Sequence, residues 1–295
     1  MARRVSALQR AQTRRAYLFL LPNIAGFFVF ILGPAVASLL LAFTNWDLLT
    51  PIQFVGLANF KEMAGDRDFR QALWNTVYYT AASVPLSIAF SLMLALVLNK
   101  VVRGISFLRA AYFIPVISST VAVAIVWMWI YEPEGGILNR LLSLIGIEGP
   151  QWLTDPSWAM PAVILMSVWK NLGYNMVIFL AGLQGIPSHL YEAARIDGAN
   201  QWSQFWYITV PLLSNTTFFV VIMSVISSFQ VFDQAYVMTK GGPAGATMTV
   251  VYYLYQNGFQ FFRMGYAAAI AWFLFVIVFA ISVIEWRAGG RYVHY

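Results

Sequence analysis

Long apolar stretches without charged residues alternate with short charged segments along the whole chain. The first three uncharged stretches lie between Arg15 and Asp47, between Arg70 and Lys100, and between Arg109 and Glu132. The fourth stretch runs from Asp155 to Leu183 and is broken by one charge, Lys170. The last two, again uncharged, run from Asp197 to Asp233 and from Arg263 to Glu285. Each is long enough to span a bilayer, since about 20 apolar residues cross the hydrocarbon core as a helix. No stretch alternates polar and apolar residues as a β-strand does. The pattern therefore predicts an all-α, polytopic membrane protein with six transmembrane helices and both termini on the same side.

The composition agrees with this pattern. The 295 residues are 60% hydrophobic and only 10% charged, whereas soluble domains are about a quarter charged. A disordered chain would be far less hydrophobic. The absence of cysteine excludes disulfides, thiolate metal sites and cysteine nucleophiles. The sequence also contains no Walker A loop, HExxH motif or GxSxG motif, so it does not indicate an enzyme.

The charged segments alternate in sign, which predicts the orientation of the spans. Basic residues without acids occupy the N-terminal tail and the loop before the third span: Arg3, Arg4, Arg10, Arg14, Arg15, Lys100, Arg103 and Arg109. The next loop is acidic, with Glu132, Glu134, Glu148 and Asp155 against Arg140. We therefore expect a basic cytoplasmic segment over residues 1–16, a transmembrane domain over 17–285 and a cytoplasmic tail over 286–295. The net charge of +6 then reflects topology, and no nucleic-acid partner is expected. A cleaved signal peptide is the less favoured alternative for the first span, which exceeds the roughly 7–15 residues of a signal core.

A polar segment between the fourth and fifth spans predicts a helical elbow over about 185–205. Pro187-Ser188 is a helix-start signal with Ser188 as the expected N-cap, and Gly198 is a stop signal, so one short helix covers about 188–196. A second helix begins near Asn200 and turns a row of side chains toward the membrane interface: Trp202, Phe205, Trp206 and Thr209. Glu192 and Arg195 can pair with each other or with a partner. The alternative is an amphipathic helix that only anchors the loop.

Prolines also lie in or beside the predicted spans. Each, including Pro115 and Pro211, removes a backbone hydrogen bond and is expected to kink its helix.

The elbow resembles a known motif. Glu192-Ala193-Ala194, Asp197-Gly198-Ala199 and the later Pro211-Leu212 resemble the EAA motif of the inner-membrane permease subunits of ABC importers. In that family the elbow is the coupling helix that seats on the cytoplasmic ATPase. The resemblance implies that ATPase coupling involves Glu192, Ala193, Ala194, Asp197, Gly198 and Ala199.

Further segments resemble the carbohydrate-uptake, maltose-type members of this family: Tyr17–Pro22, Phe43–Asp47, Phe54–Phe60, Ser228–Asp233 and Gly241–Pro243. The resemblance implies a second permease subunit, a dimer of ATPase subunits, an extracytoplasmic sugar-binding protein and the inner membrane of a bacterium or archaeon. ATP and magnesium would bind to the ATPase, and no cofactor to this chain. The chain lacks the extra N-terminal helices and the large periplasmic insertion of the maltose subunit.

A polar face in the fourth span is the candidate substrate site. Lys170 is the only charge inside that stretch, and Ser167, Lys170, Asn171 and Tyr174 share one helical face. In the fifth span Ser224 and Ser228 form a second polar face. Such groups suit a polyol, because hydroxyls and amides bind its hydroxyls and a ring packs on its apolar face. The resemblance places the sugar-contacting positions on these same six residues. Alternatively, the polar groups join transmembrane helices, and Lys170 pairs with an acid of the partner.

Two alternative functions stay open at this point. An importer of glycerol phosphate or another polyol is one, since Lys170 could meet an anion. A gradient-driven secondary transporter or channel is the other, although the spans contain no acidic relay residue and the halves show no convincing repeat.

Overall fold

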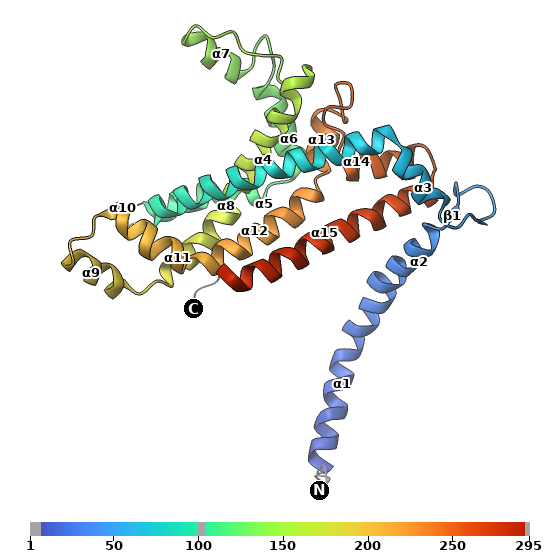
Figure 1. Cartoon of the computed structure of the whole chain (residues 1–295), viewed down its shortest axis with the longest axis horizontal. Helices are drawn as coiled ribbons and strands as arrows, with labels where there is room; N and C mark the ends of the chain where they lie inside the picture. The colour runs from blue at the N-terminus through green and yellow to red at the C-terminus, as the bar shows by residue number, and fades with distance from the viewer. Residues whose placement is uncertain (1–6, 100–103, 293–295) are drawn as a thin grey trace. The chain divides into compact units, whose positions relative to one another are not determined.

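The computed structural model describes residues 7–99 and 104–292. The first elements are α1 (Ala7–Phe27), the π-helix η1 (Phe28–Leu32), α2 (Gly33–Leu41), β1 (Thr44–Asn45), β2 (Gln53–Phe54) and α3 (Ala58–Gly65). They are followed by α4 (Arg67–Leu98), α5 (Ile105–Ile117), α6 (Thr120–Ile130), α7 (Ile137–Leu144) and α8 (Pro156–Gln184). Next come α9 (Ser188–Ile196), α10 (Gln201–Gln204), η2 (Phe205–Thr209), α11 (Val210–Leu212) and α12 (Ser214–Phe229). The last are α13 (Asp233–Met238), α14 (Val250–Tyr255), η3 (Gln256–Gln260) and α15 (Met264–Tyr292), as labelled in Figure 1.

The described residues form two compact units. The smaller unit joins the residues up to Ala64 with Asn257–Trp272, and the larger unit joins Gly65–Gln256 with the residues from Phe273 onward.

Helices that can cross a membrane dominate the described part of the chain. Four segments are long and apolar enough on their own: Arg15–Leu41, Arg67–Leu98, Pro156–Gln184 and Met264–Arg287. Two pairs qualify only together, α5 with α6 at a bend of 102° and Gln201–Leu212 with α12 at a bend of 64°. The described residues thus contain four to six candidate spans, and the prediction of a helical, multi-span protein is confirmed in this form.

The third predicted span is not one continuous helix. α5 ends at Ile117, Ser118 and Ser119 are extended, and α6 begins at Thr120. Pro115 weakens the last turn of α5 because it has no N–H to donate. The backbone N–H and the hydroxyl of Ser118 both donate to the carbonyl of Ile114, at 3.2 and 2.9 Å. The kink expected from Pro115 is therefore a complete break.

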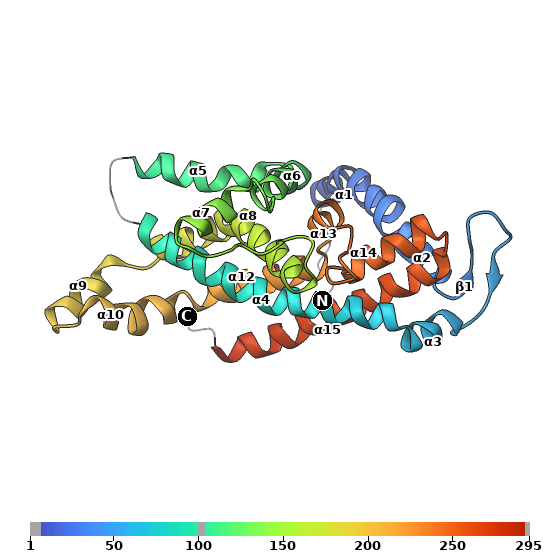
Figure 2. The ribbon, with the colours of Figure 1, turned by 90° about the horizontal axis from the view of Figure 1, so that it is seen from above.

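Three helices form the centre of the larger unit. α4 packs along α8 and also contacts α12. α5 packs on α8 as well, and the backbone of Tyr112 and Phe113 lies close to Gly173 there. Ser91 on α4 donates to the carbonyl of Leu172 on α8 at 3.2 Å. In both views α9 and α10 lie at one end of this unit, while α13 and α14 lie toward the other (Figures 1 and 2).

Gly173→Ala is expected to destabilise the packing of α5 on α8 by about 1–3 kcal/mol, the usual cost of overpacking. A Cβ at Gly173 would lie 2.1 Å from the carbonyl oxygen of Tyr112 and 3.0 Å from the Cα of Phe113. Backbone atoms cannot rotate away as a side chain can. Gly26→Ala is the matched control, because Gly26 also lies inside a helix and has nothing within 4 Å. Thermal unfolding of the purified protein measures the effect, and equal melting temperatures for the two variants would contradict it.

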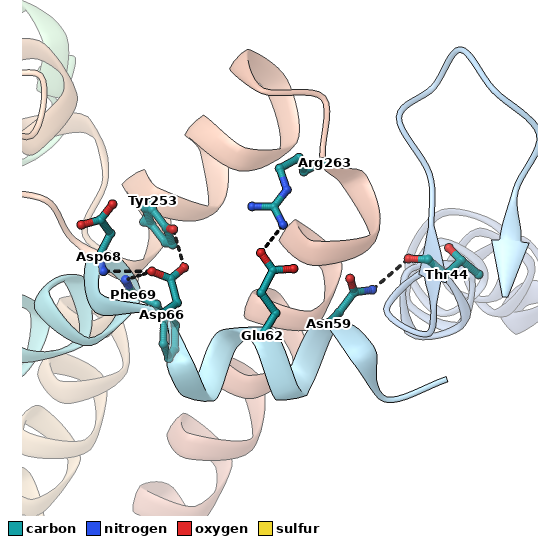
Figure 3. Close-up of polar contacts among 8 residues, drawn as sticks. All are labelled: Thr44, Asn59, Glu62, Asp66, Asp68, Phe69, Tyr253 and Arg263. Atoms are coloured by element: carbon teal, nitrogen blue, oxygen red, sulfur yellow. Dashed lines mark hydrogen bonds and ion pairs between the residues drawn. The ribbon is translucent and has the colours of Figure 1, made fainter. Parts of the chain in front are cut away.

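The smaller unit contains a short hairpin that the all-α prediction missed. β1 pairs antiparallel with β2, with Thr44 opposite Phe54. The amide of Asn59 on α3 donates to the carbonyl of Thr44 at 2.8 Å, and Glu62 forms an ion pair with Arg263 (Figure 3). Strands of two residues are too short to show polar and apolar alternation, so the sequence contains no periodic signal for them.

The loop of this hairpin is held by Asp47. Its Oδ1 accepts hydrogen bonds from the N–H of Leu49 and from the N–H and hydroxyl of Thr50, at 3.0, 2.7 and 2.8 Å. These bonds, foremost that from the Thr50 N–H, lower the pKa of Asp47 below its ordinary value. The carboxylate is therefore ionised, and holds the loop, at neutral pH.

In the larger unit Asp66 fixes the start of α4. Its Oδ1 accepts from the N–H groups of Asp68 and Phe69, at 2.9 and 3.3 Å, as an N-cap does (Figure 3). Its other oxygen accepts a hydrogen bond from the hydroxyl of Tyr253 at 2.6 Å. This contact ties the first turn of α4 to α14.

Candidate functional site

A cavity of about 540 Å³ lies in the larger unit, bordered by α4, α8, α12 and the segment that leads into α13. This volume falls within the roughly 300–1,000 Å³ of small-molecule sites. All the residues predicted to contact substrate line it: Ser167, Lys170, Asn171, Tyr174, Ser224 and Ser228. The structure therefore brings together the two polar faces that the sequence placed on separate spans. Their contact with a substrate stays a prediction.

These lining residues differ in how accessible they are. Asn171 and Tyr174 are exposed and Lys170 is half-buried. Ser167 is buried and donates to the carbonyl of Val163 at 2.7 Å, within its own helix. Ser228 is also buried and donates to the hydroxyl of Thr80 on α4 at 3.0 Å. The two buried serines thus form part of the cavity wall, while Lys170, Asn171 and Tyr174 are available to a ligand.

A row of serines on α4 also lines the cavity, and the sequence analysis did not identify it. Ser83 and Ser87 lie one turn apart on the lining. The amide of Asn175, on α8, donates to the hydroxyl of Ser87 at 3.1 Å and lies 3.5 Å from that of Ser224 on α12. This amide joins all three helices. The i,i+4 spacing of Ser83 and Ser87 was the signal that could have revealed the third wall.

The segment after α12 supplies further polar lining. Gln230, Asp233 and Gln234 border the same cavity as Lys170. The sequence analysis used Ser228–Asp233 only as a family resemblance and assigned no chemistry to Asp233. Among the described residues, no cluster of three or more histidines, cysteines or acids could hold a metal ion.

Two short helices, α9 and α10, lie between α8 and α12 in the segment where the sequence predicts an elbow. α9 covers Ser188–Ile196, as predicted. The N–H of Gly198 donates to the carbonyl of Arg195 at 3.1 Å, and the N–H of Ala199 donates to that of Ala194 at 2.8 Å. These two bonds are those of a Schellman motif. Gly198 has a φ of +82°, a left-handed conformation that glycine adopts without penalty.

Further contacts make the elbow a defined unit. Asn200 caps α10 by accepting the N–H of Ser203 at 2.8 Å, in agreement with the expected start. The hydroxyls of Tyr191 and Thr209 are 2.9 Å apart and connect α9 to η2. Thr209 is only 4% exposed, so its predicted orientation toward the membrane interface was wrong. Its hydroxyl is instead satisfied inside the elbow.

Two other local predictions in the elbow need correction. The N-cap position of α9 is Pro187, and Ser188 is already the first helical residue and makes no capping bond. Arg195 donates to the carbonyl of Tyr191 at 3.2 Å and forms no ion pair with Glu192. The glutamate is therefore left accessible to a partner.

The residues predicted to couple to an ATPase lie on the surface of the elbow. Glu192, Ala193, Asp197 and Gly198 are exposed, and Ala194 and Ala199 are half-buried. Ile196, at the end of α9, is 87% exposed. The sequence analysis did not single out this side chain.

The elbow is continuous with the cavity on both sides. α8 reaches α9 through Gly185, Ile186 and Pro187, and the chain returns from the elbow through η2 and α11 to α12. α8 and α12 carry the predicted substrate residues. The chain therefore links the elbow directly to two of the helices that border the cavity.

Comparison with known proteins agrees with this arrangement. Residues 68–285 match the family described as "Binding-protein-dependent transport system inner membrane component". The chain is 42% identical over 291 residues to the "Probable ABC transporter permease protein YesP" of Bacillus subtilis (strain 168), covering 97% of this chain and 94% of that protein. It is 37% identical to the "Lactose transport system permease protein LacF" of Rhizobium radiobacter, covering 96% of this chain and 97% of that protein.

A solved structure has the same fold. It is the crystal structure of a bacterial ABC transporter involved in the import of the acidic polysaccharide alginate, with a TM-score of 0.85 and 26% identity. The match covers 97% of this chain and 99% of that one. These findings confirm the resemblance inferred from the EAA-type residues and the expected location in the inner membrane. The chain belongs to the family of binding-protein-dependent transport system inner membrane components, the membrane-spanning permease subunits of ABC importers.

Proposed function

We propose that this permease carries a sugar or small oligosaccharide through the cavity between α4, α8 and α12. The observation that carries the proposal is this cavity, which is lined by hydroxyls, amides and an exposed tyrosine ring. Hydroxyl and amide groups bind the hydroxyls of a saccharide, and the ring packs on its apolar face. The lactose permease among its relatives supports the assignment.

The working importer contains other subunits. A second permease completes the pathway, two ATPase subunits hydrolyse ATP, and an extracytoplasmic binding protein delivers the sugar. The alginate importer has been crystallised with its substrate-bound periplasmic protein, which supports this assembly. ATP hydrolysis belongs to the partner ATPase, and this chain has no catalytic role of its own.

The membrane topology proposed here has six spans, two of them bent. Residues 1–16 and 286–295 lie in the cytoplasm around a transmembrane domain over 17–285, with residues 1–6 and 293–295 outside the described part of the chain. The candidate spans support this N-in, C-in arrangement, and so do the loop charges through the positive-inside rule. In this arrangement α9 and α10 lie on the cytoplasmic side.

The elbow couples the ATPase to the pathway. Glu192, Ala193, Asp197 and Gly198 dock on the ATPase together with the half-buried Ala194 and Ala199. Small side chains allow a close approach, and Glu192 supplies a charge that has no ion-pair partner among the described residues. Closure of the ATPase dimer then moves α8 and α12 between inward-open and outward-open states, as rigid elements with two arrangements do.

Tyr174→Ala tests the sugar assignment. Loss of the ring is expected to raise the half-saturation concentration for uptake about tenfold, which corresponds to about 1.4 kcal/mol of binding energy. Uptake of labelled saccharides by cells that carry the complete importer is the measurement. Tyr78→Ala is the control, since Tyr78 on α4 is 44% exposed against 43% for Tyr174 and does not line the cavity. An unchanged saccharide profile in Tyr174→Ala would place the substrate elsewhere.

A further inference from the structure

The cavity contains one positive and one negative side chain. Among the described residues that line it, only Lys170 and Asp233 are charged. Lys170 projects from α8 and Asp233 opens α13, on a segment separated from α8 by the whole elbow and α12. The two side chains carry opposite charges and border the same cavity. They form no direct ion pair, so each retains hydrogen-bonding capacity toward a ligand.

Two opposite charges in one cavity would act differently on uncharged and on anionic ligands. A saccharide hydroxyl can accept a hydrogen bond from an ammonium group and donate one to a carboxylate, so a neutral polyol satisfies both groups at once. A carboxylate or phosphate group accepts from the ammonium but has no proton for Asp233. It is repelled by that second charge at close range.

The family does not determine the charge of the substrate. The lactose permease serves an uncharged sugar, whereas the structurally similar importer takes up the acidic polysaccharide alginate. Besides the binding protein, the residues that line each pathway can contribute to this selection.

We propose that Asp233 is a specificity residue that balances the charge of Lys170, so that the cavity accepts uncharged saccharides and disfavours uronates and phosphate esters. This inference rests on the proposed function, because it assumes that substrate passes through this cavity. It also addresses the glycerol phosphate alternative, which an unbalanced Lys170 would favour.

The electrostatic potential of the cavity can be measured directly, because the chain contains no cysteine. Asn171→Cys places a thiol at an exposed position on the lining. In the intact importer this thiol is treated with a negatively charged methanethiosulfonate and with a positively charged one of similar size. The measured quantity is the rate of reaction with the anionic reagent divided by the rate with the cationic reagent, and it is compared with the same ratio for a free thiol in solution. The parent importer without the engineered cysteine corrects for reaction of the partner subunits.

We expect a ratio close to that of the free thiol when Lys170 and Asp233 are both present. Asp233→Asn should raise the preference for the anionic reagent about tenfold, as expected for an unbalanced charge at short range in a partly hydrated site. Adding Lys170→Met should abolish that preference. A ratio that already strongly favours the anionic reagent, or one that Asp233→Asn leaves unchanged, overturns the proposal. A thiol that reacts with neither reagent also overturns it, since the cavity would then be closed to ligands.

A second measurement compares uptake of β-1,4-mannotriose with that of β-1,4-trimannuronate, and of galactotriose with trigalacturonate. Preferential uptake of the acidic member of either pair by the unmodified importer overturns the proposal. Uptake of neutral members alone supports it. If the reagent ratios shift as expected while Tyr174→Ala leaves the saccharide profile unchanged, the charge balance stands and the sugar pathway assigned to this cavity fails.

Discussion

Gly198→Asp is expected to abolish sugar uptake while the importer still inserts and assembles. Gly198 closes α9 in a left-handed conformation, with a φ of +82°. A residue with a side chain pays about 1–2 kcal/mol to adopt this left-handed conformation. The substitution therefore weakens the two hydrogen bonds that end α9, from Gly198 to Arg195 and from Ala199 to Ala194. No atom lies within 4 Å of the Cβ position, so the new carboxylate points into open space where the proposed ATPase surface would dock. Radiolabelled uptake, with the amount of assembled complex measured by affinity purification, records both quantities.

The chain offers a closely matched control in Gly146. It follows α7 in the same Schellman geometry, with a φ of +77° and open space around its Cβ position. The N–H of Gly146 donates to Ser143 at 3.0 Å and the N–H of Ile147 to Leu142 at 3.0 Å. Gly146→Asp therefore imposes the same backbone strain outside the elbow, and we expect it to retain most uptake. Equal loss in both variants would show that strain, not location, is responsible. Normal uptake in Gly198→Asp would refute the coupling role.

Asn171→Trp is expected to block the pathway and reduce uptake by at least about tenfold, because the indole fills space that the substrate needs. Asn171 is exposed on the lining of the cavity, so the larger side chain can be accommodated without repacking the helices. Assembly of the complex should therefore be normal. Uptake at saturating sugar is the measurement, since a blocked pathway lowers the maximal rate and is not rescued by more substrate.

Leu165→Trp controls for the bulk of tryptophan on α8. Leu165 is 45% exposed and does not line the cavity. Tryptophan is tolerated at lipid-facing and interfacial positions, so this variant should transport normally. If Asn171→Trp also transports at the normal rate, the cavity is not the pathway.

Much of the elbow was predictable from the sequence because helix ends are encoded locally. The proline before Ser188 and the glycine after Asp197 bound α9 at the residues where the structure begins and ends it. The capping residue was misassigned by one position, because proline and serine are both start signals and only the backbone angles distinguish them. The sequence also left open whether Glu192 pairs with Arg195 or with a partner protein. Its neighbour Arg195 bonds to the helix backbone, a choice set by side-chain geometry.

The cavity was only half predictable. Helical spacing correctly grouped the polar residues of α8, since residues three and four apart share a face. The same rule applied to α4 would have found Ser83 and Ser87. Asp233, by contrast, reaches the cavity through the break after α12 and the start of α13, and spacing along one helix cannot predict such a contact.

The sequence by itself determined the class of protein, the approximate positions of its apolar spans, the alternating charges of its loops and the short helix of the elbow. These features depend on the hydrophobicity of single residues and on signals a few residues long, and the membrane enforces them wherever the chain folds. Only the tertiary structure decided that serines of α4 complete the cavity and that Asp233 shares it with Lys170. Those outcomes depend on packing between segments far apart in the chain, where the energy of a contact is set by both partners and cannot be read from either one alone.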